Sequence, residues 1–546
     1  MKKEFSGRPL TTDRRCLLKA GATALGTALL PNTLMAQAVK RGGTLRVSNG
    51  GDPPDFDLHQ TVTYLTEFVG SPCYSTLLKI DPDNSERLLP DLAEGFEVSA
   101  DGRTVMFKIR RGVQFHDGSA LSAEDVVFSL DRIRNPPAGV VSPRKGLFGN
   151  ISEIAATDSH TVVIKLQAPQ DDFLFLISNP FNVIYPKSVT APLDQQNQGM
   201  KRKIVGTGPF KLTQAIDGQI YELSRFDKFY GQPPHLEKIQ FFPIKDEVAR
   251  AVALQGNRID ACFFFSNDSV MQTLRGVPNV IAIQRPTPTS INLVPNVRVK
   301  PFDDLRVREA LSLAIDRSSF IKTVGPLAGA NFHSKGLMLP GSPFELDAAQ
   351  IKQFSGYDTL PGLNGDIEAN RKKAMQLLEQ AGVPKGFKIV LPARNDLAAF
   401  RDSSINLAAQ LQAVGLDVSV DMKDAAAFFA QENRGDFQLL VHSIGFSGTR
   451  PDQILGEGYT SFGGRNYGGW KEDEVDDLFR QQSRERDPNK RADLIRQFQT
   501  RFLKTYFHIN LAWVGYGAGY TNAMKGWKPI SDIYANMQLD NVWLDK

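Results

Sequence analysis

Residues 89–133 read LPDLAEGFEVSADGRTVMFKIRRGVQFHDGSALSAEDVVFSLDRI, and this stretch decides how the rest of the chain is interpreted. Residues 104–109 (TVMFKI) alternate between apolar and polar side chains, as a half-buried strand does. Ser122 stands three residues before Asp125 at the start of an apolar-periodic run, which is the capping-box pattern of a helix N-terminus. The stretch therefore predicts a strand, a loop and then a helix.

The first 38 residues have the pattern of an export signal. Arg14 and Arg15 precede a short apolar run over 20–30, and residues 36–38 (AQA) form a small-x-small triplet suited to a signal peptidase. The paired arginines resemble a twin-arginine leader, and an ordinary secretory signal is the alternative. A membrane span would need roughly 20 apolar residues, more than this run offers. We therefore expect a periplasmic protein, cleaved near Ala38, whose mature chain does not insert into the membrane.

Charge and length narrow the class of protein. The formal net charge of +4 lies wholly in the leader, which holds six lysines and arginines against two acids. The mature chain is close to neutral, so nucleic acid is not expected as a partner. Its roughly 500 residues are too many for one core, and two or three packed units are expected. Cys73 and Cys262 remain after cleavage, as a disulfide or as two buried thiols.

The hydrophobic periodicity places strands and helices along the whole chain. Strands are predicted at 44–48, 104–109, 161–166, 220–224, 237–242, 259–265, 387–391, 416–422, 437–444 and 508–514. Helices are predicted at 122–133, 246–255, 304–322, 367–381, 400–413, 424–433, 472–484 and 488–505. From 385 to 444 strands and helices alternate, which is typical of an α/β unit, whereas the N-terminal half is richer in strands and turns.

The order of these segments suggests a chain that builds one lobe, crosses to a second and returns. Residues 285–288 (RPTP) read as an extended crossing segment, and the strand at 508–514 follows the end of the α/β unit. Two crossing strands of this kind can act as a hinge. We expect a first lobe over 39–285, completed by 515–546, and a second lobe over 286–514.

Several blocks in the right order resemble the bacterial extracellular solute-binding proteins, in the branch that feeds dipeptide, oligopeptide and nickel ABC importers. These blocks are 89–133, 205–210 (VGTGPF), 253–260 (ALQGNRID), 301–317 (PFDDLRVREALSLAIDR) and 457–477 with Asp487 and Arg491. The resemblance implies an α/β, two-lobed periplasmic-binding-protein fold with mixed sheets, its N-terminal lobe enlarged by an extra α+β subdomain. It also implies a monomer that captures a small solute and delivers it to the transmembrane subunits of an ABC permease.

No recognisable catalytic, metal or cofactor motif is found in the sequence. None of the seven histidines has a second His or Cys at metal-ligand spacing, and His116 reads as structural. Residues 515–519 (GYGAG) lack the spacing of a dinucleotide site. We expect neither an enzyme nor a cofactor. A nickel-chelate or haem binder of the same family is one alternative, and a periplasmic hydrolase is an alternative from another class.

The loop 443–452 (SIGFSGTRPD), which follows the apolar strand at 437–442, is the first candidate binding site. In peptide-binding relatives this loop carries an aspartate that pairs with the α-ammonium of the peptide, and the matching residue here is Ser447. Arg450 offers instead a planar fork of donors suited to a carboxylate or phosphate. We therefore predict a solute with an anionic group, contacted by Phe446, Ser447 and Arg450. The alternative is that Arg450 pairs with a nearby acid such as Asp452 or Glu457.

Aromatic side chains at strand ends and beside the crossing segments form the second part of the predicted site. Flat rings bury solute area at low entropic cost, although most aromatics in a chain of this size build cores. The candidates are Tyr64, Phe265, Trp513 and Tyr516, with Asn292 on the other crossing segment.

Overall fold

The computed structural model describes residues 39–546 apart from 330–331, 334, 396 and 447. Within this range Lys40–Lys546 form one compact unit. The predicted leader and its cleavage site near Ala38 lie outside the described residues, and so does Ser447.

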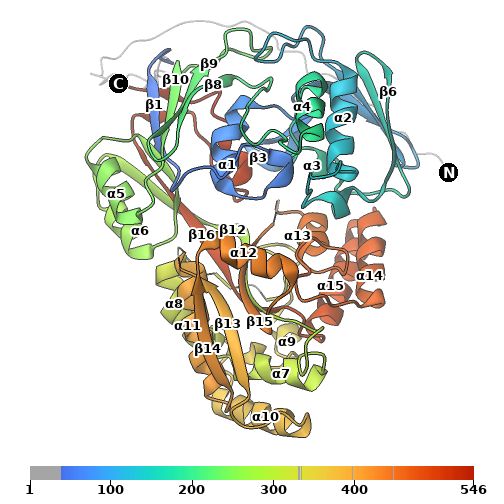
Figure 1. Cartoon of the computed structure of the whole chain (residues 1–546), viewed down its shortest axis with the longest axis vertical. Coiled ribbons are helices and arrows are strands. Elements are labelled where there is room, and N and C mark those ends of the chain that lie inside the picture. Colours follow the sequence, from blue (N-terminus) through green and yellow to red (C-terminus); the bar gives the residue numbers. More distant parts are fainter. Residues whose placement is uncertain (1–38, 330–331, 334, 396, 447) are drawn as a thin grey trace, which may run out of the picture. The chain divides into compact units, whose positions relative to one another are not determined.

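The largest sheet has eight strands in the order β15-β12-β16-β11-β1-β10-β9-β8 (Figure 1). Their bounds are β15 Leu439–Gly445, β12 Val280–Pro295, β16 Ile509–Thr521, β11 Ala261–Phe265, β1 Thr44–Ser48, β10 Lys238–Phe242, β9 Ile220–Arg225 and β8 Phe210–Ile216. The two longest, β12 and β16, are antiparallel and pair from Val280 with Thr521 to Leu293 with Ile509. These two strands connect two groups of hydrophobic cores, which we call the first and second lobes.

The first lobe contains strands β1 and β8–β11 and a separate four-stranded antiparallel sheet in the order β4-β5-β7-β6. Its core runs from Leu45 to Phe264 and from Ala518 to Leu544, and a smaller cluster lies around Phe265 and Leu274. Its other elements are η1 Leu58–Gln60, α1 Tyr64–Gly70, η2 Ser71–Cys73, β2 Leu78–Asp81, β3 Asn84–Pro90, β4 Ala93–Val98, β5 Thr104–Ile109, α2 Ala123–Arg134, η3 Lys145–Phe148, β6 Ile151–Asp158, β7 Thr161–Leu166, α3 Phe173–Ile177, α4 Lys187–Gln195, α5 Glu247–Gln255, α6 Asp268–Arg275, β17 Met524–Lys525, η5 Tyr534–Met537 and β18 Trp543–Leu544.

The second lobe has two cores. One packs around β15 and the parallel pair of β13 and β14, and the other around Ile444, Phe446 and Trp513 together with α13–α15. Its elements besides β15 are α7 Leu305–Ala314, α8 Arg317–Ala328, α9 Ala348–Ile351, η4 Tyr357–Thr359, α10 Ile367–Gln380, β13 Lys388–Arg394, α11 Ala398–Gln412, β14 Asp417–Lys423, α12 Ala425–Arg434, α13 Pro451–Gly458, α14 Asp473–Arg484 and α15 Pro488–Leu503. The alternating order predicted for 385–444 is confirmed.

The predicted strand and helix of the opening stretch are confirmed as β5 and α2. The capping box forms, with the Ser122 backbone N–H donating to Asp125 Oδ2 at 2.9 Å. Between them, the His116 N–H donates to the Gly206 carbonyl at 2.8 Å, and its ring Nε2 lies 3.1 Å from the Gly208 carbonyl oxygen. Burial lowers the pKa of His116 to about 4, so this ring is neutral and ties two turns of the first lobe together. The structural reading of His116 is confirmed.

One predicted helix is two helices in the structure. The sequence over 304–322 has no break in its apolar period, yet α7 ends at Ala314 and α8 begins at Arg317. Asp316 caps α8 by accepting the Ser319 N–H at 3.0 Å. The buried guanidinium of Arg317 donates to the carbonyl oxygens of Gly356 and Asn510 at 2.7 and 3.1 Å. These long-range bonds, which no local pattern encodes, fix the bend.

Both cysteines of the described residues are buried free thiols, so the disulfide left open by the sequence is not formed. Burial raises the pKa of Cys73 and Cys262, which keeps both as thiols. Over residues 39–546, with the gaps given above, no helix is long and apolar enough to cross a membrane. The same residues contain no group of three or more His, Cys, Asp or Glu placed to hold a metal ion.

His59 is expected to make the stability of the first lobe fall at acid pH. Its ring is fully buried, with Nε2 2.9 Å from the Val183 carbonyl oxygen, and burial together with the charge of Arg132 lowers its pKa to about 3. In the unfolded chain the His59 ring takes up a proton near pH 6.5. The contribution of the neutral, buried ring to stability is therefore fully present above pH 6.5 and is lost as the pH falls towards 3. Between pH 6.5 and 4, the free energy of unfolding should fall less steeply in His59→Gln than in the wild type. We expect the two slopes to differ by about 1 kcal/mol per pH unit.

Urea unfolding at four pH values measures this slope, and His160→Gln, at a partly exposed histidine, is the matched control. Parallel curves for the wild type and His59→Gln would show that His59 does not carry the effect.

Candidate functional site

The second-lobe strand β15 ends against a tyrosine of the first lobe. A Cβ added to Gly445 would lie 3.1 Å from Tyr534 Oη and 3.8 Å from Thr289 Oγ1. The Tyr534 hydroxyl donates to the Val62 carbonyl oxygen at 3.3 Å, which holds the ring beside the start of α1. At this point the two lobes approach so closely that only a glycine fits without a shift of the tyrosine.

Three rings of the first lobe pack in a row and form an aromatic wall at the lobe boundary. Tyr64 of α1 and Phe264 of β11 are stacked with centroids 3.9 Å apart and planes 6° from parallel. Tyr516 of β16 lies 3.9 Å from Phe264 on a tilted plane, and it packs against cores of both lobes. Rings of this kind can bury a flat or apolar part of a solute.

The charges of two second-lobe arginines act on first-lobe tyrosines, Arg465 on Tyr534 and Arg394 on Tyr64 and Tyr516. Arg465 donates to the Gly445 carbonyl oxygen at 2.8 Å and to Tyr467 Oη at 3.0 Å. Burial alone would lower the pKa of Arg465, but Tyr467 and nearby acids raise it. Arg465 therefore stays positively charged. Arg394, at the end of β13, stacks over Phe400 with its guanidinium carbon 4.8 Å from the ring centroid.

The positive charge of Arg394 also affects the titration of two first-lobe tyrosines across the lobe boundary. Burial raises the pKa of Tyr64 and Tyr516, and the charge of Arg394 opposes both shifts. The charge of this second-lobe cation therefore reaches two first-lobe tyrosines.

The first lobe contributes buried acids and an amide to the same region. Burial raises the pKa of Asp532 to about 7, and the pKa of Glu67 lies well above its usual value for the same reason. The Ser71 hydroxyl lowers the Glu67 pKa slightly, yet neither Glu67 oxygen makes a hydrogen bond of normal geometry. The side-chain amide of Asn49, just after β1, is also buried without a partner among the described residues. Buried polar groups without partners are costly, which is typical of sites completed by a ligand or water.

A cavity of about 470 Å³ opens between the lobes next to these groups. First-lobe residues Ile80, Pro82, Asp83, Ser85, Phe175, Arg285, Lys528, Pro529, Ile530, Ser531 and Asp532 line it, together with second-lobe residues Thr449, Arg450 and Gln453. Its volume lies within the range of small-molecule sites, about 300–1,000 Å³.

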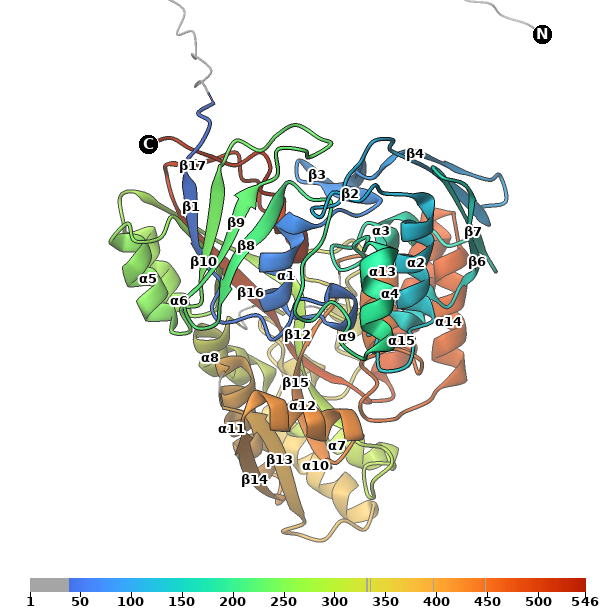
Figure 2. The ribbon, with the colours of Figure 1, turned by 45° about the horizontal axis from the view of Figure 1, so that its top comes forward.

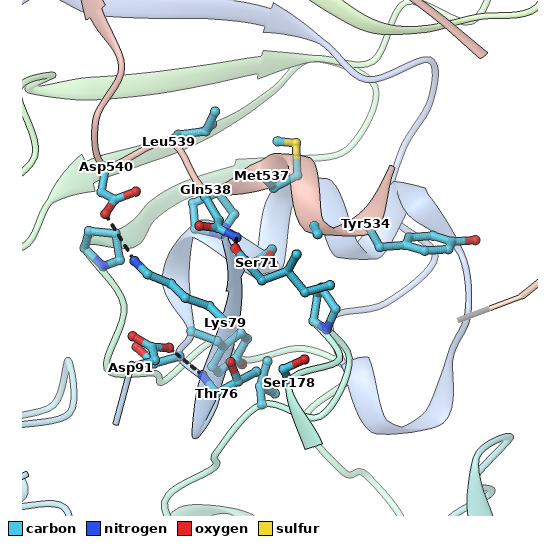
Figure 3. A pocket seen from close by; sticks show the side chains of 18 of the residues that line it. Ser71, Thr76, Lys79, Asp91, Ser178, Tyr534, Met537, Gln538, Leu539 and Asp540 are labelled. Atoms are coloured by element: carbon cyan, nitrogen blue, oxygen red, sulfur yellow. Dashed lines mark hydrogen bonds and ion pairs between the residues drawn. The ribbon is translucent and has the colours of Figure 1, made fainter. Parts of the chain in front are cut away.

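A second cavity, drawn in Figure 3, lies within the first lobe and measures about 70 Å³. Lys79 and Asp540 form an ion pair at 3.5 Å on one side of it, and the Thr76 N–H donates to Asp91 Oδ2 at 2.9 Å. It has room for a few waters and is too small for a solute of peptide size.

Charged residues of both lobes meet in what we call the inter-lobe ion cluster: Asp171, Asp172, Arg450, Asp452 and Arg491. Arg491 donates to Asp172 Oδ2 at 2.6 Å and to Asp171 Oδ2 at 2.5 Å, and Arg450 donates to Asp172 Oδ1 at 3.1 Å. Helices α13–α15 lie beside η3 and α3 at this point (Figures 1 and 2). The cluster joins the lobes independently of the aromatic wall.

The structure brings together only part of the predicted binding residues. Tyr64 and Tyr516 stand in the aromatic wall. Arg450 lines the cavity between the lobes, but its guanidinium is held by Asp172 and Glu86 of the first lobe and stacks on Phe175 at 4.3 Å. The alternative partners named from sequence, Asp452 and Glu457, are not the acids it pairs with.

Four other predicted residues lie inside packed cores. Phe265, Asn292, Phe446 and Trp513 are all fully buried, Phe265 below Arg250 and the other three inside the second lobe. These four side chains have no exposed surface, and their contact with a solute stays a prediction. For Phe265 the reason for the burial is strand alternation, because its neighbour Phe264 takes the opposite face of β11 and points to Tyr64.

Sequence reasoning missed Arg465 and Asp172, and from the aromatic run 263–265 it selected Phe265 rather than Phe264. Side chains alternate between the two faces of a strand, so the sequence of β11 already indicates that Phe264 points away from the face shared by Phe263 and Phe265. Arg465 and Asp172 lie in irregular segments with no local signal, and only the folded chain brings them to the boundary.

Comparisons with known proteins agree with this architecture. Residues 87–466 match the family model described as bacterial extracellular solute-binding proteins, family 5 Middle. The dipeptide-binding protein of Escherichia coli (strain K12) is 28% identical over 517 residues, covering 89% of this chain and 92% of that protein. The glutathione-binding protein of the same strain is 28% identical over 424 residues, covering 77% of each.

Solved structures share the two-lobed fold. The periplasmic binding protein DppA from Helicobacter pylori, in complex with the peptide STSA, has a TM-score of 0.80 at 23% identity and covers 93% of this chain and 99% of its own. AgaA from A. tumefaciens R10, in complex with agropinic acid, has a TM-score of 0.81 at 24% identity and covers 92% and 99%.

Proposed function

We propose that this chain, which belongs to the family 5 bacterial extracellular solute-binding proteins, captures a small peptide-like or carboxylated solute between its lobes for an ABC importer. The observation that carries the proposal is the aromatic wall of Tyr64, Phe264 and Tyr516 at the lobe boundary, where the charge of the second-lobe residue Arg394 acts on Tyr64 and Tyr516. Rings and guanidinium groups on opposite walls can bury the apolar part of a solute while pairing with its carboxylate.

The proposed cycle involves binding without chemistry. Contacts with both lobes favour the closed form, which docks on the transmembrane subunits of a permease. We propose a monomer exported to the periplasm by the twin-arginine route and cleaved near Ala38. The lobes are proposed as 39–285 with 515–546, and 286–514. The names of the dipeptide-binding and glutathione-binding relatives support a peptide-like cargo.

Binding is tested by titrating the purified mature protein with dialanine, glutathione and agropinic acid in a calorimeter, and by weighing any copurified solute by native mass spectrometry. We expect at least one solute to bind and to be recovered unchanged. Saturation at 100 times the dissociation constant should stabilise the protein by about 2.7 kcal/mol. A protein that binds none of them and carries no solute, or that converts the solute, would contradict the proposal.

Tyr516→Ala should weaken binding by about tenfold or more, because it removes the ring that contacts both lobes. Tyr520→Ala is the matched control on the same strand, since the Tyr520 ring packs on Trp527 within the first lobe at 5.2 Å. The ratio of the two dissociation constants is the measurement. Equal losses of affinity in both variants would show that the aromatic wall is not part of the binding site.

A further inference from the structure

The cavity of about 470 Å³ between the lobes extends the proposed site outwards. Arg285 and Tyr516 are directly paired partners in the antiparallel ladder of β12 and β16, so their side chains leave the same face of the sheet next to each other. Arg285 lines the cavity and Tyr516 belongs to the aromatic wall. On another side, Asp532 lines the cavity two residues before Tyr534, which touches Gly445. A solute on the aromatic wall can therefore reach into this space.

Three cations line the cavity, and two of them already have acidic partners. Arg450 is held by Asp172 and Glu86. Lys528 pairs with both oxygens of Asp83 at 2.6 and 2.7 Å. Arg285 makes no ion pair or side-chain hydrogen bond with any other residue that the structure describes, and its side chain is exposed on the cavity wall. Its guanidinium fork is thus available to a ligand.

The other lining residues are the polar Ser85, Thr449, Gln453 and Ser531 and the apolar Ile80, Pro82, Phe175, Pro529 and Ile530. The polar side chains suit hydroxyl or amide groups of a solute. A dianionic phosphate would lie close to the acids Asp83 and Asp532 on the same wall, whereas a single carboxylate matches one free guanidinium.

We propose that this cavity is an outer subsite for a polar extension of the solute that ends in a carboxylate, with Arg285 as the residue that binds it. The inference rests on the proposed function and narrows its cargo to compounds longer than a dipeptide, with a second carboxylate beyond the part that contacts the aromatic wall. Arg285 determines specificity at this subsite, and the wall provides binding that is common to all solutes.

The test compares three probes on the mature protein by calorimetry: glutathione, its glycine monoethyl ester, and dialanine, which is too short to reach the outer subsite. Wild type should bind glutathione about tenfold more tightly than the ester, because the ester lacks the terminal carboxylate. Arg285→Gln should bind both equally and leave dialanine unchanged. Arg285→Lys keeps the charge without the fork and should retain part of the preference.

Arg275→Gln is the matched control, since it removes an exposed first-lobe arginine that does not line the cavity and should keep the full preference for glutathione. An unchanged preference in Arg285→Gln, equal binding of acid and ester by wild type, or an equal loss in Arg275→Gln would overturn the outer subsite. Binding of dialanine but not glutathione would overturn it too while leaving the proposed function intact. Binding of no probe and no copurified solute would overturn both.

Discussion

Arg491→Met will open the protein without unfolding it. The side chains of Arg491 and Asp172 are only 6% and 1% exposed, and Arg491 also lies 3.3 Å from Asp452. Removing the cation leaves buried carboxylates without their main partner, at a cost of about 3 kcal/mol. Asp172 belongs to the first lobe and Asp452 to the second, so separating the lobes returns both to water. The closed form should lose about a hundredfold in population relative to the open form.

The titration of the acids supports the same expectation. Burial would raise the pKa of Asp172, but Arg491 and Arg450 lower it below its usual value. Burial and the charge of Asp172 raise the pKa of Asp452. The two carboxylates therefore repel each other when the lobes are closed, and Arg491 is the main group that offsets this repulsion.

Small-angle X-ray scattering without solute measures the opening as a larger radius of gyration, and calorimetry measures weaker binding of whichever probe binds the wild type. The melting temperature of each lobe should change little. Arg480→Met is the control, because Arg480 on α14 makes an exposed pair with Asp477. Scattering curves that coincide for the wild type and Arg491→Met would contradict a closing role for the ion cluster.

Arg132→Met will instead unfold the first lobe more easily. Arg132 of α2 is as deeply buried as Arg491 and also pairs with two acids, at 2.7 Å to Asp57 Oδ2 and 2.7 Å to Asp194 Oδ2. Both acids belong to the first lobe, so no movement between lobes can return them to water. Burial alone would raise the pKa of Asp57, but Arg132 lowers it to about 2. We expect the free energy of unfolding to fall by about 3–5 kcal/mol at pH 7.

The loss should shrink at low pH, because without Arg132 the buried Asp57 can take up a proton that the wild type excludes. Urea unfolding at pH 7 and pH 4 measures both effects, with scattering as a check that the lobes stay closed. Arg134→Met, two residues along the same helix at a partly exposed pair with Asp131, is the control. A loss below about 1 kcal/mol in Arg132→Met would show that the pair is replaceable by packing.

Local patterns located most of the secondary structure. The strands predicted at 44–48, 104–109 and 161–166 have the bounds of β1, β5 and β7, because period-two alternation is fixed by one buried face. The helix predicted at 367–381 is present as α10, and Asp366 caps it by accepting the Glu368 N–H at 3.0 Å. The prediction of one helix over 304–322 is wrong, because the break between α7 and α8 depends on hydrogen bonds from Arg317 to Gly356 and Asn510.

The binding residues were harder to predict, and the reason is geometric. Tyr64 and Tyr516 were selected as aromatics at the ends of elements, and both line the lobe boundary. Trp513, only three residues from Tyr516, lies on the opposite side of a long strand that changes its neighbours at a bulge. Periodicity cannot show which face of such a strand is covered by a second core.

The sequence by itself determined the family and the alternating strands and helices of 385–444, because these follow from motifs and from short-range periodicity. Tertiary structure alone decided that Arg450 pairs with acids of the other lobe and that Arg285 is left available. It also decided that Phe264 rather than Phe265 faces the boundary between the lobes. Charges far apart in the chain select their partners only when folding brings them together, since the energy of an ion pair depends on distance and burial rather than on sequence separation.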